Sequence, residues 1–228
     1  MMNEIELPDG DVLLHAGDAT FKGDEFEINQ FNQDLKKAKA KYRSVIFTPG
    51  NHDWGFQRMH TFSESLMTNA TVLIDQGVWL GKDGVIIAKY TGQTHDELPE
   101  GSLLVYGSPW QPRFYNWAFN LDRGEPLARK WAMIPDHVDI LITHGPPLGI
   151  LDKVHGENVG CWDLRERIKS LTRLRLHVCG HIHYSYGVYR EDKVTFANAS
   201  VCNEGYDANN KPIVVDVFAG QSNAINVI

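Results

Sequence analysis

The chain has few features of an exported or membrane protein. Its three cysteines, Cys161, Cys179 and Cys202, show no CxxC spacing, so they predict buried thiols rather than a disulfide framework. No stretch of the sequence approaches the ~20 apolar residues that a membrane span needs. The N-terminus has no basic patch followed by an apolar run, so no secretory signal is visible. A cytoplasmic location is therefore the default expectation.

Basic residues are also too few for a broad positive surface. The formal net charge is −7 over 228 residues, which argues against a protein that binds nucleic acid through surface charge. Nucleic acid is therefore not expected as a partner. Hydrophobic residues make up 43% of the chain, enough to build a core. The length fits one large domain, residues 1–228, better than two.

Buried strands and amphipathic helices alternate at the start of the chain and again after residue 138. Residues 12–16 and 45–47 predict strands, and apolar residues recur between them at helical spacing from Ile28 to Tyr42. This order predicts a βαβ unit with parallel strands covered on both faces. Short strands in the middle predict antiparallel hairpins. The remaining predicted strands lie at 72–74, 78–80, 85–90, 103–106, 138–142, 176–179, 184–189, 194–198 and 213–218, and the helices at 56–68, 124–131 and 163–171.

Four of these strands end in polar clusters. The clusters are Gly17-Asp18, Gly50-Asn51-His52-Asp53, His144-Gly145 and Gly180-His181-Ile182-His183. Ligands of open α/β sheets bind at the carboxyl ends of the strands, so the clusters should converge. Imidazole combined with oxygen ligands suits Zn, Fe, Mn or Ni. Alternate residues of an extended segment face opposite sides, so both histidines of the last cluster can serve one centre only if the backbone turns there.

The four clusters together resemble the motifs of the calcineurin-like metallophosphoesterase superfamily. Residues 11–20, 107–124, 131–148 and 176–202 are most similar to its metallophosphoesterase-domain group, so the resemblance covers nearly the whole chain. It implies an α/β fold, an αββα sandwich of two mixed β-sheets flanked by helices. It also implies hydrolysis of phosphate esters by a metal-activated hydroxide. Some members of that group hydrolyse cyclic nucleotides, so a small phosphodiester such as a nucleotide is the expected substrate.

The resemblance implies which residues bind metal. Asp18 would bridge two divalent ions. Asn51, His144 and His181 would complete one metal site, and His183 would belong to the other.

The resemblance also implies how substrate is held. Asn51 and His52 would contact the phosphate, with His52 as a donor to the leaving or a non-bridging oxygen. Asp53 would either orient His52 from behind or cap a helix. The aromatic segment 110–119 would either stack on a base or pack as a loop over the sheet edge. Arg113 is a further candidate phosphate contact.

One motif of the superfamily is absent. Its Asp-x-His, at the end of an initial strand, has no counterpart in residues 1–7, which offer only Glu4 and Glu6. We therefore expect the first strand of the fold to be missing from the sequence, and the second metal site keeps only Asp18 and His183. A truncated sequence and a true variant with one metal site both explain this. We expect truncation, because every later motif is present. For the chain as written we expect one retained metal ion and weakened hydrolysis.

Three other interpretations remain open. The chain could be a catalytically impaired relative that binds metal or nucleotide, as the absent motif suggests. It could be another enzyme of the superfamily, such as a protein phosphatase or a DNA nuclease. It could also be a scaffold whose histidines are only hydrogen-bonded, which the convergence of four clusters disfavours.

Overall fold

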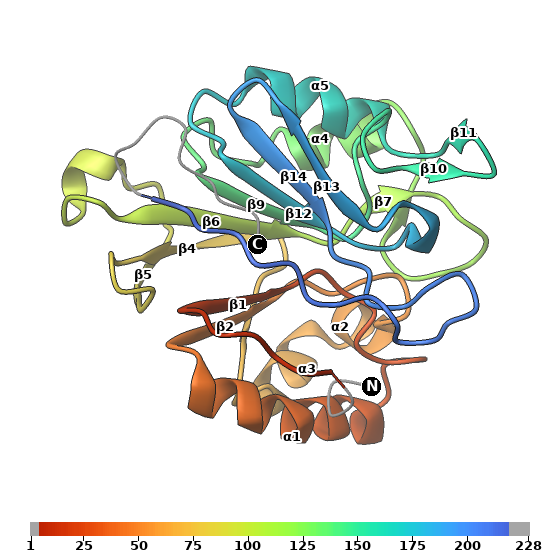
Figure 1. Cartoon of the computed structure of the whole chain (residues 1–228), viewed down its shortest axis with the longest axis horizontal. Coiled ribbons are helices and arrows are strands. Elements are labelled where there is room, and N and C mark those ends of the chain that lie inside the picture. The colour runs from red at the N-terminus through yellow and green to blue at the C-terminus, as the bar shows by residue number, and fades with distance from the viewer. Residues whose placement is uncertain (1–4, 219–228) are drawn as a thin grey trace.

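Two β-sheets lie face to face with helices on their outer sides in the computed structural model, which describes residues 5–218 (Figure 1). The smaller sheet has the order β1-β2-β3, and both of its pairings are parallel. Its strands are β1 (Val12–His15), β2 (Ser44–Phe47) and β3 (Thr71–Val72). Helix α1 (Glu25–Lys41) connects β1 to β2, as the βαβ pattern predicts.

Local sequence explains where the helices of this layer begin and end. Asp24 caps α1, because its side chain accepts a hydrogen bond from the Glu27 amide at 2.9 Å. The single helix predicted over 56–68 is two helices, α2 (Trp54–Arg58) and α3 (His60–Leu66). They are separated by Met59, whose φ of −134° and ψ of 50° lie outside the helical region.

The larger sheet is mixed and has seven strands in the order β13-β14-β12-β9-β6-β4-β5. The four central strands run parallel, and the pairings at both ends of the sheet are antiparallel. The strands are β4 (Gln76–Leu80), β5 (Ile86–Lys89), β6 (Leu103–Ser108), β9 (Ile140–Thr143), β12 (Leu176–Cys179), β13 (Gly187–Glu191) and β14 (Val194–Asn198).

The remaining elements are short. Helices α4 (Glu125–Trp131) and α5 (Trp162–Ser170) cover the outer face of the larger sheet (Figure 1). Single 3-10 turns occur at η2 (His95–Glu97) and η3 (His183–Ser185). Two small pairs, β7 (Gln111–Pro112) with β8 (Asn120–Leu121) and β10 (Lys153–Val154) with β11 (Glu157–Asn158), lie in the connecting loops. Among the described residues, we find no helix long and apolar enough to cross a membrane.

Three hydrophobic clusters fill the spaces between the layers. One lies between α1 and the smaller sheet, one between the two sheets, and one beneath α4 and α5. The expected αββα sandwich is therefore confirmed. Two details differ from the prediction. The smaller sheet is parallel rather than mixed over residues 5–218, and residues 213–218 belong to neither sheet.

The topology brings the predicted clusters to one end of the molecule. β1 and β2 are parallel neighbours in one sheet, and β9 and β12 are parallel neighbours in the other. Each pair therefore ends on the same side, where the chain continues into residues 17–18, 50–53, 144–145 and 180–183.

Candidate metal centre

Three of the predicted ligands meet at this end of the sheets. Asp18, His144 and His181 each offer a ligand atom, and these atoms all lie within 4.8 Å of one another. The Asn51 Oδ1 atom lies 2.8 Å from His144 Nε2, and Asp18 Oδ2 lies 3.3 Å from the same nitrogen. Donor atoms that share an ion at roughly 2.1 Å are spaced about 3 Å apart. The four side chains thus offer the donor set of a metal site, and those of Asp18, Asn51 and His144 already lie near its spacing.

Backbone conformation aims two of these side chains. Asp18 and His181 have φ angles of 55° and 67°, in the left-handed region that non-glycine residues seldom adopt. Such residues cluster at functional sites because the surrounding structure must hold them there. Gly17 has a φ of 102°, and an added Cβ would lie 2.6 Å from Gly50 N and from His144 Nδ1. The two turns therefore approach too closely for any side chain at this glycine.

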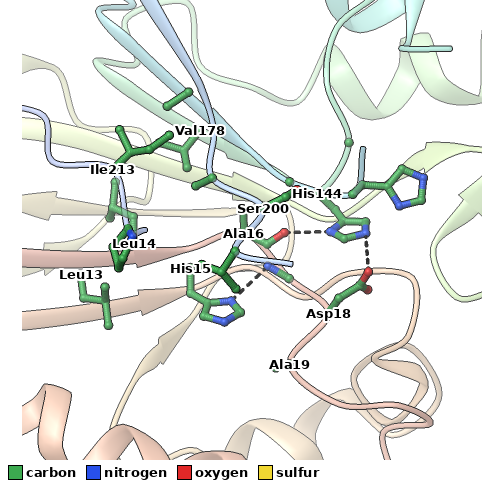
Figure 2. A pocket seen from close by; sticks show the side chains of 18 of the residues that line it. Leu13, Leu14, His15, Ala16, Asp18, Ala19, His144, Val178, Ser200 and Ile213 are labelled. Carbon is green, nitrogen blue, oxygen red and sulfur yellow. Dashed lines mark hydrogen bonds and ion pairs between the residues drawn. The ribbon is translucent and has the colours of Figure 1, made fainter. Parts of the chain in front are cut away.

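His144 is oriented by a main-chain hydrogen bond. Its Nδ1 lies 2.8 Å from the Ala16 carbonyl oxygen, which can only accept, so Nδ1 carries a proton and Nε2 faces Asp18 and Asn51 (Figure 2). Burial lowers the pKa of His144, but the Asp18 carboxylate raises it further, and the net shift is upward. Burial raises the pKa of Asp18, yet His144 outweighs this and holds that pKa well below its usual range. The Asp18 carboxylate therefore stabilises a positive charge on the neighbouring His144 ring.

His181 completes the cluster as a neutral imidazole. Loss of contact with water, reinforced by the nearby His144, lowers the pKa of His181 to about 3. Its ring lies 4.8 Å from that of His144. A neutral imidazole has a lone pair available for a metal ion.

His52 stands beside this cluster in an aromatic clamp. Its Nδ1 lies 3.1 Å from the Phe21 carbonyl oxygen, so Nδ1 donates and Nε2 is left without a proton in the neutral ring. The ring of Trp117 lies 4.2 Å from that of His52, and the ring of Phe21 lies 5.6 Å from it. The backbone amide of His52 donates to Asp18 Oδ1 at 3.0 Å. These contacts fix the imidazole next to the predicted metal ligands.

Asp53 has a different role from either predicted one. Its carboxylate accepts hydrogen bonds from the Gly50 amide at 2.7 Å and from the Thr20 amide and hydroxyl at 2.9 and 2.7 Å. It does not orient His52, whose ring is held by Phe21, and it makes no side-chain capping bond to α2. Burial and the nearby Asp18 raise the pKa of Asp53 to about 6. Asp53 thus ties the turn after β1 to the turn after β2.

His183 lies apart from the cluster. Its Nδ1 is 3.0 Å from the Asn203 carbonyl oxygen, and its ring packs edge-on against Tyr206 at 5.1 Å. The backbone does turn at His181, as a shared centre would require. The turn nevertheless directs His183 towards residues 203–206. The resemblance assigns His183 to the other metal site, so its distance from this cluster agrees with that assignment, while its role as a ligand stays a prediction.

The aromatic segment 110–119 has both buried and exposed members, and its stacking on a base stays a prediction. Phe119 is buried and packs against Trp110 at 5.5 Å, whereas Phe114 is exposed and approaches His181 edge-on at 5.9 Å. The Ala118 amide donates to the Asn51 carbonyl at 2.9 Å, which fastens the segment to the centre. Arg113 pairs with Asp122 at 2.7 Å, and its contact with phosphate stays a prediction.

Sequence reasoning missed His15, and it singled out segment 110–119 without indicating the contact of Trp117 with His52. His15 accepts a hydrogen bond from the Gly17 amide at 3.2 Å (Figure 2). Its ring also contacts those of Phe31 and Phe47 edge-on. Burial lowers the pKa of His15 to about 4. Its position at the end of β1 was the only available signal. Trp117 lies 65 residues after His52, so no local pattern indicates their contact.

Comparison with known proteins places this geometry in context. A model of the calcineurin-like phosphoesterase family matches residues 1–185. Metallophosphoesterase domain-containing protein 1 of Homo sapiens is 40% identical over 230 residues, covering 93% of this chain and 66% of that protein. UPF0046 protein T07D4.2 of Caenorhabditis elegans is 38% identical over 224 residues, covering 93% of this chain and 56% of that protein. This chain thus spans less than two thirds of either relative. One solved structure superposes with a TM-score of 0.52 at 15% identity, covering 96% of this chain and 87% of the other, which supports the fold.

Proposed function

The chain belongs to the calcineurin-like phosphoesterase family, and we propose that it is a metal-dependent phosphoesterase acting on small phosphodiesters such as cyclic nucleotides. The observation that carries this proposal is the meeting of Asp18, His144 and His181 ligand atoms within 4.8 Å, next to Asn51. These side chains fit a divalent ion of the Mn, Fe, Zn or Ni type, because they combine imidazole nitrogens with a carboxylate and an amide oxygen.

A divalent ion held there would act as a Lewis acid towards the phosphate and lower the pKa of an attacking water. The protein would supply position and charge. His52 would donate from Nε2 to a phosphate oxygen in its imidazolium form, while Nδ1 keeps its hydrogen bond to the Phe21 carbonyl. Asn51 would add an amide group beside the same phosphate. Asp53 would keep the two turns in register through Thr20 and Gly50.

A second candidate function is binding of metal or nucleotide with impaired hydrolysis. The observation that favours it is the make-up of the cluster: of the residues that the resemblance assigns to the second metal site, only Asp18 is among the side chains whose ligand atoms meet, and His183 is not. A second ion near Asp18 would then have few protein ligands among the described residues. Two-metal phosphoesterases place ions about 3.5–4 Å apart, so a single ion would stabilise the transition state less well.

One experiment separates these functions. The purified chain is analysed for bound metal by mass spectrometry and tested for hydrolysis of bis(p-nitrophenyl) phosphate and of 2′,3′- and 3′,5′-cyclic AMP. His181→Ala serves as the matched control, because it removes one cluster ligand. Hydrolysis well above that of His181→Ala supports the phosphoesterase. Metal binding with equal hydrolysis in both proteins supports the impaired relative. A nucleotide as the natural partner and a cytoplasmic location stay predictions.

A further inference from the structure

A short loop, residues 19–24, joins the metal centre to the start of α1. Phe21 of the loop and Glu27 of the helix line a cavity of about 1560 Å³, which also reaches the ligand cluster. His52 takes its orientation from the Phe21 carbonyl. A group that fixes this loop therefore also bears on the proposed hydrolysis.

The Glu27 carboxylate binds three successive amides of the loop. Its Oε2 accepts hydrogen bonds from the Lys22 and Gly23 amides, both at 2.8 Å. Its Oε1 accepts one from the Phe21 amide at 3.3 Å. Successive amides of this kind form a concave site for an anion. The φ of Gly23 is 69°, in the left-handed region, which lets the chain curl around the carboxylate.

These contacts differ from ordinary capping of α1. Glu27 is the third residue of the helix, and in a capping box its side chain would bind the amide of Asp24. The hydrogen bonds that the structure gives this side chain go instead to the three residues before Asp24. Asp24 caps the helix through its own side chain. The carboxylate of Glu27 thus serves the loop rather than the helix end.

One peptide group connects Glu27 to His52. The Phe21 carbonyl, which accepts from His52 Nδ1 at 3.1 Å, and the Lys22 N–H belong to the same planar unit. This peptide is trans, so its N–H and C=O point in opposite directions, and fixing the first also fixes the second. A carboxylate on the N–H further polarises the carbonyl and makes it a stronger acceptor. Glu27 therefore acts on the imidazole through a single main-chain group.

The other end of the loop has an anchor of its own. Thr20 donates to Asp53 from its amide at 2.9 Å and from its hydroxyl at 2.7 Å. Neither bond involves the peptide group between residues 21 and 22. Thr20 thus fixes the chain before Phe21, and Glu27 fixes the direction of the Phe21 carbonyl.

We propose that Glu27 is a positioning residue for His52 and acts through the peptide group between Phe21 and Lys22. It holds His52 Nδ1–H against the carbonyl and so keeps Nε2 facing the phosphate. The inference rests on the proposed function for its effect on rate, whereas the state of the ring can be measured without a substrate.

Nuclear magnetic resonance of the metal-free chain, with nitrogen-15 in its histidines, shows which ring nitrogen carries the proton. At about pH 8 the ring is expected to be neutral, and His52→Gln assigns the signals. We expect the Nδ1–H form of His52 in the unchanged chain and a shift towards the Nε2–H form in Glu27→Ala. Glu27→Gln keeps an acceptor and should restore the Nδ1–H form.

Glu25→Ala is the matched control, because it removes an exposed negative charge from the same helical turn. This variant should keep the Nδ1–H form and unchanged hydrolysis. A His52 ring that stays in the Nδ1–H form in Glu27→Ala overturns the proposal, and so does an equal change in Glu25→Ala.

Kinetics separates this role from a general loss of structure. With bis(p-nitrophenyl) phosphate, Glu27→Ala should lower kcat about 10- to 100-fold, as misplaced groups do, with KM and metal content unchanged. The same substitution in a His52→Gln background should cause no further loss. A full additional loss there would mean that Glu27 acts by another route, which contradicts the proposal. If the unchanged chain hydrolyses no ester while the His52 ring changes form in Glu27→Ala, the positioning stands and the proposed phosphoesterase fails.

Discussion

His181 and His183 stand two residues apart after the same strand, yet only His181 joins the cluster of ligand atoms. His181 has a φ of 67° and directs its ring to Asp18 and His144. His183 begins η3 and pairs with Asn203 and Tyr206. A Gly-His-x-His sequence therefore brings both histidines to the end of the strand. The left-handed backbone conformation of His181 accompanies the turn that places its ring, and not that of His183, in the cluster.

The largest expected effect is the loss of metal affinity in His181→Ala, compared with His183→Ala. His181→Ala removes one of four donors and should lower metal affinity at least about 100-fold, beyond the 10–100-fold typical of residues that only support a ligand. Hydrolysis of bis(p-nitrophenyl) phosphate should fall to background. His183→Ala should retain one tightly bound ion per chain. Metal titration by calorimetry measures both, and thermal unfolding of the metal-free variants checks that each is folded. Equal losses in the two variants would place both histidines in one centre.

The next effect separates metal binding from the handling of substrate. His52→Gln keeps a polar side chain beside Phe21 but removes the imidazole. Hydrolysis should fall roughly 100- to 1,000-fold, within the range of general acid–base groups, while metal content stays that of the unchanged chain. Atomic absorption and steady-state kinetics on the same preparations provide the two readouts. If His52→Gln lost its metal together with its activity, His52 would be a metal ligand like His181.

A smaller effect is expected at the aromatic clamp. Trp117→Leu removes the ring that lies 4.2 Å from His52. Aromatic pairs contribute about 0.5–1.5 kcal/mol, so kcat should fall about 3- to 10-fold with metal content unchanged. The loss should be larger for substrates with poor leaving groups, if His52 donates the proton. Trp162→Leu, at an exposed tryptophan that does not line the cavity, is the control and should leave kcat unchanged.

The difference between the two histidines also shows how far the sequence reaches. Parallel strands end on one side of a sheet, so the convergence of the four polar clusters could be predicted from strand order, while the choice of Asp18, Asn51, His144 and His181 within them came from the family resemblance. The contacts of His183 with Asn203 and Tyr206 could not be predicted, because they join two separate loops. The hydrogen bonds from Thr20 to Asp53 could not be predicted either, since they join two turns 33 residues apart. Long-range side-chain pairing, rather than strand order, is the part that requires coordinates.

A third histidine, His177, extends the comparison to a residue that contributes stability and should leave hydrolysis at neutral pH unchanged. It is buried within β12, its Nε2 lies 2.8 Å from the Thr143 hydroxyl, and its Nδ1 has no partner in the described structure. Burial lowers the pKa of His177 to about 3 in the folded chain. The unfolded pKa is about 6.5, so His177 contributes stability above that value and loses it as the pH falls from 6.5 towards 3. One such proton makes the free energy of unfolding fall by about 1.4 kcal/mol per pH unit.

Urea unfolding of the metal-free protein between pH 7 and 4.5 measures this slope. The free energy of unfolding should fall less steeply with decreasing pH for His177→Leu than for the unchanged chain. His155→Leu, at an exposed histidine, should keep the original slope. Identical slopes in all three proteins would mean that His177 is protonated in the fold at little cost, and that its burial does not keep it neutral.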